Sequence, residues 1–534
     1  MTTISSTYDT TAPGEISYGY DCDSIDTTYK RKKRPPYEAT APDIVLAFSL
    51  IVMGFFFWEW SVLIAASLGR FAFFIGIICI SLIYMHLNGI RQNRRSIIAL
   101  GICLAGVIPF FLYDGIPIHF FLFLFVCAVY LIWIMYSNNT QISNKLSGFI
   151  ISDYVNQWLI VPFLNFAGLF ISFKGLRKKD GKGRTLLAAL IGTIAAIPVI
   201  MLIVSLLMGS DSYFEKFMQD FIDTLKLDNI GTYILELFVG IPVACYIFGS
   251  VYGNSHKRGL DKISREGSEK ALSAAHKIPE AAVYAPITLI NIIYIAFICI
   301  MAGYLFSALA GRLPESFTYA EYARRGFFEL CGVTVINMCL LVFGYVFAKR
   351  DHKVYPKKLR ILTAILTVLT MLLGVIALSK LLLYIEAYGL SRMRVYPLWF
   401  IVLILLVCIC LIIWHIRPFN VGRPIVIISV VMILALFLPN SDGLIAKYNV
   451  DQYLRGQLKT IDVEMIGGMS NAAIPALREL EAKADDEDIR MAAAAAMNNQ
   501  ISFSDLFLHD KDFARWNLQS VLIKDRPIKS ERAG

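Results

Sequence analysis

Residues 396–415 read YPLWFIVLILLVCICLIIWH and contain no Asp, Glu, Lys or Arg. About 20 apolar residues in a helix cross the roughly 30 Å hydrocarbon core of a bilayer, and buried helices of soluble proteins are seldom so long and so uniformly apolar. Further apolar runs occur at 44–66, 71–87, 97–113, 118–136, 185–208, 230–253, 285–310, 327–348, 361–383 and 424–438. The sequence therefore predicts an all-α, polytopic transmembrane helix bundle of about 11 spans.

The composition supports a membrane protein over a soluble one. Of the 534 residues, 57% are hydrophobic and 17% are charged, whereas soluble domains carry about 25% charged residues. The net charge of +9 comes largely from short loops between apolar runs, and no polar segment combines a basic patch with interleaved aromatics. We therefore expect the lipid bilayer as a partner and no nucleic acid.

Two polar segments flank the apolar region. Residues 1–43 are rich in Ser, Thr, Tyr and Asp and end in a basic stretch at 30–34, so they predict a disordered tail. Residues 439–534 carry 12 Lys and Arg together with many acidic residues, and their apolar positions recur at helical spacing. We expect three regions: a tail (1–43), a transmembrane helical domain (44–438) and a small helical soluble domain (439–534).

Loop charges predict the orientation of the chain. Segment 149–173 is apolar, but polar residues and Pro162 interrupt it. If it does not span, the loops on one side hold 29 Lys and Arg and the opposite short loops hold 8. Positive charge resists translocation, so the N-terminus is predicted to be cytoplasmic and the C-terminal domain extracytoplasmic. Because a spanning 149–173 would break this bias, an interfacial or re-entrant segment is favoured.

The sequence offers little catalytic or metal-binding chemistry. Nine of the ten cysteines lie in apolar runs, no metal-ligand spacing is present, and no phosphate-loop or nucleophile motif occurs. We therefore expect no catalytic residue, metal or cofactor. Ionisable residues within spans are costly and suggest function; Glu59 and Glu236 are such residues, and Lys380 lies near enough to the end of its run to snorkel to water.

Two predicted outer loops combine Tyr, Glu and Arg immediately before a span. They read FTYAEYARRGFFEL (317–330) and SKLLLYIEAYGLSRMRVY (379–396). Charge of this density suggests that the loops pack against each other, and the alternative is a pair of interface helices anchored by Tyr and Arg. The predicted outer-face polar network comprises Glu59, Glu236, Tyr319, Glu321, Tyr322, Arg324, Arg325, Glu329, Lys380, Glu386, Arg392 and Arg394.

These loops, together with DGLIAKYNV (442–450), resemble a bacterial multi-pass membrane family known as domain of unknown function 4153/4173. The resemblance covers most of residues 40–520 and excludes the polar tail. It implies a location in the bacterial cell membrane, and it implies no established activity.

Three classes of function stay open at this point. The first is a non-enzymatic sensing, regulatory or assembly protein whose tail, inner loops and outer domain bind protein partners. The second is a transporter, for which the prolines within the spans could break helices. The third is an interfacial enzyme acting on lipid or envelope substrates, using the Glu, Arg and Lys residues of the two loops. The sparse charge within the spans favours the first class.

Overall fold

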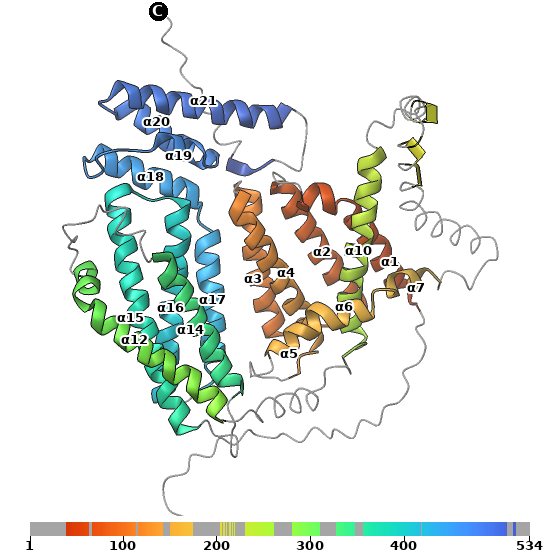
Figure 1. Ribbon diagram of the computed structural model, residues 1–534. Coiled ribbons are helices and arrows are strands. Elements are labelled where there is room, and N and C mark those ends of the chain that lie inside the picture. Colours follow the sequence, from red (N-terminus) through yellow and green to blue (C-terminus); the bar gives the residue numbers. More distant parts are fainter. Residues whose placement is uncertain are drawn as a thin grey trace, which may run out of the picture. The chain divides into compact units, whose positions relative to one another are not determined.

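The computed structural model describes residues 39–62, 67–113, 116–142, 150–174, 230–260, 280–309, 327–347, 356–417, 419–509 and 516–519, with isolated residues between 203 and 218. Within these residues every regular element is a helix (Figure 1). The predicted all-α class is therefore confirmed.

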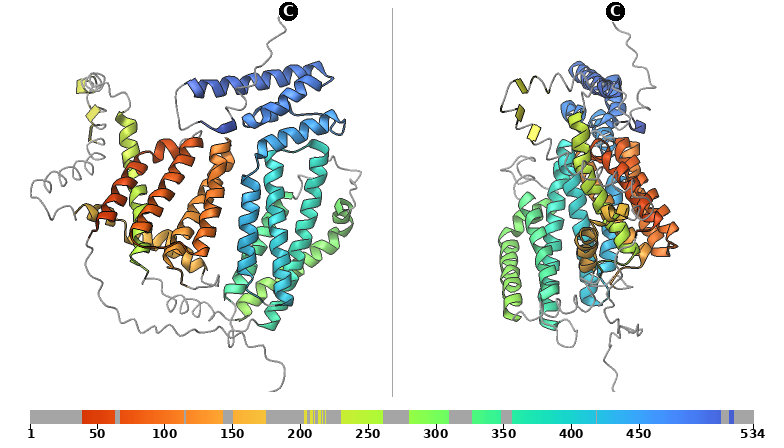
Figure 2. Two further views of the ribbon diagram at one scale, coloured as in Figure 1. Left: turned by 180° about the vertical axis from the view of Figure 1, so that it is seen from behind. Right: turned by 90° about the vertical axis from the view of Figure 1, so that its right-hand side faces the viewer.

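The first group of apolar helices packs side by side (Figures 1 and 2). Large side chains fill its interior, and Phe74, Phe110, Trp133 and Phe248 are fully buried. Uniform apolarity suits helices that contact both protein and lipid. The elements of this group are α1 (Ala41–Phe55), the π-helix η1 (Trp58–Val62), α2 (Ser67–Leu87), α3 (Arg94–Leu112), α4 (Ile116–Asn138) and α10 (Ile230–Ser255).

Segment 150–174 contains one continuous helical stretch, a turn at residues 165–167 and a short final helix. The continuous stretch consists of α5 (Ile150–Val155), the π-helix η2 (Asn156–Ile160) and α6 (Val161–Leu164), and the final helix is α7 (Gly168–Lys174). Gln157 and Asn254 exchange hydrogen bonds of 2.8 and 3.1 Å, which fix η2 to the last turn of α10. The short helices lie across α10 rather than along it (Figure 1), in agreement with the prediction that this segment does not form a single span.

A second group of long helices follows. It consists of α12 (Glu280–Leu309), α14 (Phe327–Phe347), α15 (Lys357–Tyr388), α16 (Arg392–Ile416) and α17 (Gly422–Phe437). Thr363, Thr367 and Thr370 lie on one buried face of α15 and satisfy their hydroxyls by donating to carbonyls one turn earlier. Asn337 of α14 donates to Thr370 across 2.9 Å, so a short polar seam joins the two helices.

Most of the predicted spans coincide with helices of the described residues. Among the described residues, seven helices are long and apolar enough to cross a membrane, or eight if α17 and the helix after it form one bent span. Two further apolar helices, Ala41–Phe55 and Glu329–Tyr345, are shorter. The predicted run 185–208 lies outside the described residues apart from isolated positions. The chain is thus a polytopic helix bundle, and a count of about 11 is not confirmed.

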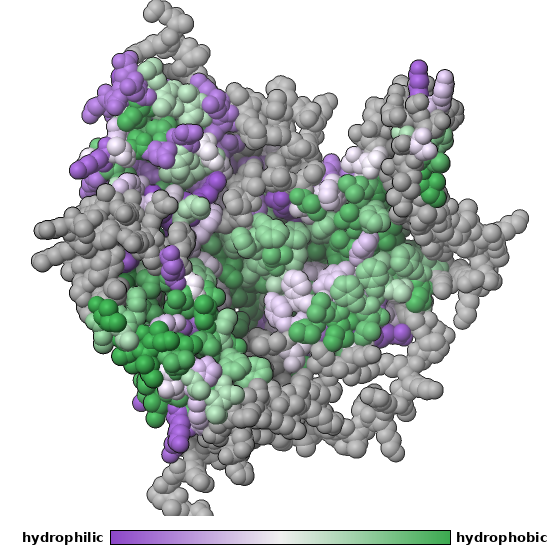
Figure 3. Space-filling view, in the orientation of Figure 1, coloured by the Kyte–Doolittle hydropathy of each residue, from purple (hydrophilic) through white to green (hydrophobic). Residues whose placement is uncertain are grey.

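The C-terminal helices form a compact unit with its own core. They are α18 (Ser441–Leu454), α19 (Val463–Gly467), the 3-10 helix η5 (Asn471–Ala473), α20 (Ile474–Lys483) and α21 (Glu487–His509). Ile445, Ile466, Leu477 and Leu480 are almost completely buried in this core. Hydrophilic residues gather over this unit in Figure 3, whereas hydrophobic residues cover the long helices. We refer to α18–α21 as the end domain.

Candidate functional site

The turn between α15 and α16 joins the bundle to the end domain. Gly389 ends α15 with φ +74° and ψ −171°, a conformation essentially limited to glycine. Arg394 provides hydrogen-bond donors for carbonyl groups at the end of α15: its Nη1 donates to the carbonyls of Tyr388 (2.8 Å) and Gly389 (2.6 Å). Its guanidinium also lies 4.2 Å from the ring centroid of Tyr384. Residues 389–394 are thereby held in one conformation.

Arg392, the first residue of α16, forms a bidentate ion pair with Asp442 of α18. Its Nε and Nη2 lie 2.8 and 2.6 Å from the two carboxylate oxygens. Asp442 is 4% exposed and also accepts a hydrogen bond from the backbone N–H of Ser470 at 3.0 Å. One carboxylate therefore connects α16, α18 and the turn before η5, and each connection is charge-assisted.

The surroundings of Asp442 favour its ionised form. Burial alone would raise the pKa of the carboxyl, but the hydrogen bonds and charge of Arg392, together with the backbone hydrogen bond from Ser470, outweigh burial and lower the pKa. Asp442 is therefore a carboxylate at neutral pH, as the ion pair requires.

A second polar contact holds the same turn. Asn449 accepts from the Leu390 N–H and donates to the Leu390 carbonyl, both at 2.7 Å. A Cβ placed on Gly389 would lie 2.4 Å from Oδ1 of Asn449. The glycine thus provides both the backbone conformation and the space that Asn449 occupies.

Leu390 makes the junction apolar as well as polar. It packs against the core of the end domain and also against the buried cluster of α14, α15 and α16 that contains Leu381 and Ile385. Tyr448 of α18 packs against that same bundle cluster. We call Gly389, Leu390, Arg392, Asp442, Asn449 and Ser470 the junction.

Residues far apart in the sequence contact α2 and the end of α3 in the first helix group. Tyr113, after α3, donates its hydroxyl to the carbonyls of Phe437 and Pro439. Leu68, in the first turn of α2, donates its N–H to the Trp516 carbonyl at 3.1 Å. Tyr84, near the other end of α2, donates to Asp43 at 2.6 Å. Residues 43 and 516 therefore contact opposite ends of the same long helix.

The predicted polar network is divided between separate parts of the molecule. Tyr319, Glu321, Tyr322, Arg324 and Arg325 lie outside the described residues. The predicted packing of the two loops therefore stays a prediction. Of the first loop, Glu329 is described, and its charge acts on Lys380.

Within the second loop the described side chains differ in exposure. Lys380 is 2% exposed and does not reach the surface of the bundle as a snorkelling lysine would. Glu386 is exposed. Arg392 belongs to the junction, where its partner is Asp442, and Arg394 donates to the carbonyls at the end of α15.

Glu59 and Glu236 belong to the first helix group. Glu59 lies in η1, and Glu236 lies in α10, where it is 3% exposed. The negative charge of Glu59 acts on Glu236. Both residues lie apart from the junction.

Sequence reasoning missed the junction partners Asp442, Asn449 and Ser470. Asp442 and Asn449 are seven residues apart, about two helical turns, which places them on one face of a helix. Asn440 caps that helix by accepting from the Gly443 N–H. This spacing, inside a stretch quoted for its family resemblance, was the available signal.

A further buried polar cluster, at the other end of the first helix group, was also missed. Asp43 is 1% exposed and accepts from Tyr84, from the Thr40 N–H (2.9 Å) and from the Thr40 hydroxyl (2.8 Å). His256 of the α10 end lies 3.6 Å from the same carboxylate. The cluster fixes the start of α1 to α2 and to the end of α10.

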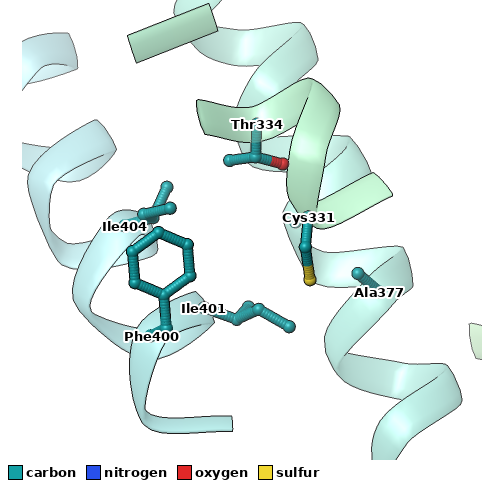
Figure 4. A pocket seen from close by; sticks show the side chains of 7 residues that line it. Cys331, Thr334, Ala377, Phe400, Ile401 and Ile404 are labelled. Atoms are coloured by element: carbon teal, nitrogen blue, oxygen red, sulfur yellow. The ribbon is translucent and has the colours of Figure 1, made fainter. Parts of the chain in front are cut away.

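A small apolar pocket lies between α14, α15 and α16 (Figure 4). It is lined by Cys331, Thr334, Gly374, Ala377, Phe400, Ile401 and Ile404. Its empty space is about 220 Å³ with the mouth included, below the roughly 300–1,000 Å³ of ordinary ligand sites. In the described part of the chain, no group of three or more His, Cys, Asp or Glu residues could hold a metal ion.

Comparison with known families gives one clear result. The model of the family described as Domain of unknown function (DUF4153) matches residues 96–480. Comparison with curated proteins and with solved structures gave no match. The matched region includes both sides of the junction and extends over more than half of the chain. The chain therefore belongs to the family described as Domain of unknown function (DUF4153).

Proposed function

We propose that this protein is a non-enzymatic membrane protein of the sensing, regulatory or assembly class, in which the end domain and the helix bundle change conformation together. The observation that carries the proposal is the junction, where Arg392 and Leu390 engage the end domain through a bidentate ion pair and a shared apolar contact. A domain tethered by a bare linker would not need such contacts.

The junction supports coupled movement of the end domain and the bundle because several hydrogen bonds hold its two sides together. Asp442 has charge-assisted bonds on two sides, and Asn449 bonds both polar groups of the Leu390 backbone. A partner that shifts α18 therefore acts directly on the adjoining ends of α15 and α16. Such a partner biases the bundle only by binding one arrangement more tightly than the other.

The same proposal assigns the tail to the cytoplasm and the end domain to the outer side of the bacterial cell membrane. It is supported by the 29 to 8 asymmetry of loop charge and by the contacts of residues 43 and 516 with opposite ends of α2. Reporter fusions at residues 40 and 534 are expected to lie on opposite sides. Fusions on the same side would contradict this orientation.

Recovery of partners from native membranes tests the functional class. The full chain, cross-linked in its own membrane, is expected to recover protein partners, and Arg392→Ala is expected to reduce that recovery several-fold without loss of insertion. Lys483→Ala is the control, because Lys483 lies on the end-domain surface and pairs with Glu479 away from the junction. Equal recovery by wild type and Arg392→Ala would contradict the proposal.

A transporter is the second candidate, and Glu236 is the observation that favours it. A buried carboxylate within an apolar helix is typical of ion-coupled carriers. Purified protein that moves a solute into liposomes, with transport lost in Glu236→Gln, would replace the first proposal with this one.

A further inference from the structure

Helices α1 and α10 run antiparallel, and η1, which carries Glu59, also packs against α10, which carries Glu236. At one end, Asp43 of α1 meets His256 just beyond α10. Gly54 then contacts Gly240, and Phe55 stacks on Tyr233 with ring centroids 6.2 Å apart. Glu59 follows Gly54 by five residues and Glu236 precedes Gly240 by four, so both carboxylates lie on the same side of the glycine contact.

The glycine crossing keeps the two helices unusually close. A Cβ on Gly240 would lie 2.1 Å from the carbonyl oxygen of Gly54, so the two backbones are in contact. Small residues permit such approach in membrane helices.

Glu236 is buried without enough partners for a charge. Its side chain is 3% exposed, and within the described structure its Oε2 has no hydrogen-bond partner. An ionised carboxylate in such a place is costly, and protonation removes the cost. The unpartnered oxygen is also the atom on which a proton could sit.

The charged groups around α10 add to this effect. Of the described elements packed against α10, α1 carries Asp43, α4 carries His119 and α7 carries Lys174. Asp43 is engaged at the far end, and His119 lies 3.5 Å from Arg70 of α2. Arg70 donates to the Ser61 carbonyl of η1. Glu59 is the group whose charge acts on Glu236.

We propose that Glu236 and Glu59 form a proton-binding site within the first helix group, with Oε2 of Glu236 as the proton acceptor. A hydronium ion of the solvent donates the proton: its O–H bond breaks as the O–H bond at Oε2 forms, water is released, and the charge of the pair changes from −2 to −1. Two carboxylates that share a site cannot both ionise readily, which favours one bound proton at neutral pH. Proton binding at this site does not depend on the proposed function. A role of the bound proton in signalling does rest on the proposed function.

Infrared spectroscopy of the full chain in lipid nanodiscs tests the site directly. At neutral pH, wild type is expected to show the C=O stretching band of a protonated carboxyl, which shifts in heavy water. Glu236→Gln is expected to lose that band, and the control Glu386→Gln, which changes an exposed carboxyl outside the pair, is expected to keep it. Absence of the band in wild type, or its survival in Glu236→Gln, would overturn the proposal.

A second variant separates pairing from burial. In Glu59→Gln the repulsion is gone, so the band is expected to disappear on raising the pH at a point about one unit or more below that of wild type. An unchanged point would mean that Glu59 takes no part in the site and would overturn the pair. None of these readouts depends on partner recovery, so this inference and the proposed function can fail separately.

Discussion

The junction and the carboxylate pair both contain a buried carboxylate, but the two carboxylates differ in the partners around them. At the junction, Asp442 faces Arg392 and a backbone N–H, and its charge is satisfied. At the α1–α10 crossing, Glu236 faces another acidic side chain, and one of its oxygens has no described partner.

A buried charge can stabilise one arrangement of the protein, or it can serve as a binding site for a ligand that neutralises it. A paired and hydrogen-bonded charge fixes one arrangement, and removing one partner is costly because it leaves the other buried. An unsatisfied charge is expensive as it stands and becomes favourable when a ligand neutralises it. The four predictions below test this contrast, beginning with the largest expected effect.

Arg392→Ala should weaken the junction most. It leaves the carboxylate of Asp442 buried with the Ser470 N–H but without its countercharge. Because Arg392 is partly exposed, we expect a loss of about 3 kcal/mol in the free energy of opening the end domain from the bundle, at the lower end of values for buried pairs. Urea-dependent pulse proteolysis in nanodiscs measures this loss. A change as small as that of Lys483→Ala would contradict the account.

Gly389→Ala should cost about 2 kcal/mol, because a Cβ at this φ and ψ is strained and meets Oδ1 of Asn449. The double variant with Asn449→Ala removes the clash but retains the strain. In a double-mutant cycle, the loss of stability in the double variant should therefore be smaller than the sum of the losses in the two single variants. Strict additivity would show that Gly389 and Asn449 do not interact.

The junction should also respond to acid with a defined sign. Because the folded pKa of Asp442 is lowered, its contribution to stability is fully present above its unfolded value of 3.8 and is lost as the pH falls through the lower folded pKa. Opening of the end domain should thus increase below about pH 4 in wild type. Asp442→Asn should be less stable at neutral pH and should lack this part of the acid dependence. An identical acid profile in both proteins would contradict the assignment.

Glu236→Gln should have the smallest effect on stability. If the carboxyl already carries a proton, an amide of the same shape replaces it without removing a countercharge. The midpoint of thermal unfolding in nanodiscs should therefore match that of wild type. A loss comparable to that of Arg392→Ala would show that Glu236 is a paired anion, and the contrast drawn above would disappear.

The helical class followed directly from the sequence, because runs such as 396–415 have few alternatives to a spanning helix. The break of segment 149–173 was only partly indicated, since the helix continues through Asn156, Gln157 and Pro162 and is interrupted at residues 165–167, where Asn165 is the polar residue. Among the described residues, seven of the predicted spans meet the length and apolarity test, whereas α1, α17 and the stretch Glu329–Tyr345 of α14 are shorter. Helix α17 has 16 residues, and α1 has 15, so apolarity alone did not measure their length.

The candidate site was less predictable because pairing depends on tertiary contacts. Arg392 and Asp442 are 50 residues apart, and no local spacing connects them. The sequence identified Arg392 as charged and close to a span, but it offered several acidic residues of the predicted outer loops as partners. The sequence identified Glu59 and Glu236 as ionisable residues within apolar runs. Their proximity depends on the packing of α1 and η1 against α10, which includes the contact between Gly54 and Gly240.

Hydrogen exchange of the end domain in lipid nanodiscs tests the central claim most directly. If the junction couples the end domain to the bundle, the amides of α18 and those at the end of α15 and the start of α16 should open as one unit in wild type. Arg392→Ala should speed exchange in α18 about 100-fold, the equivalent of about 3 kcal/mol. Lys483→Ala should leave it unchanged. Exchange in α18 that is equally slow in wild type and Arg392→Ala would contradict the coupling.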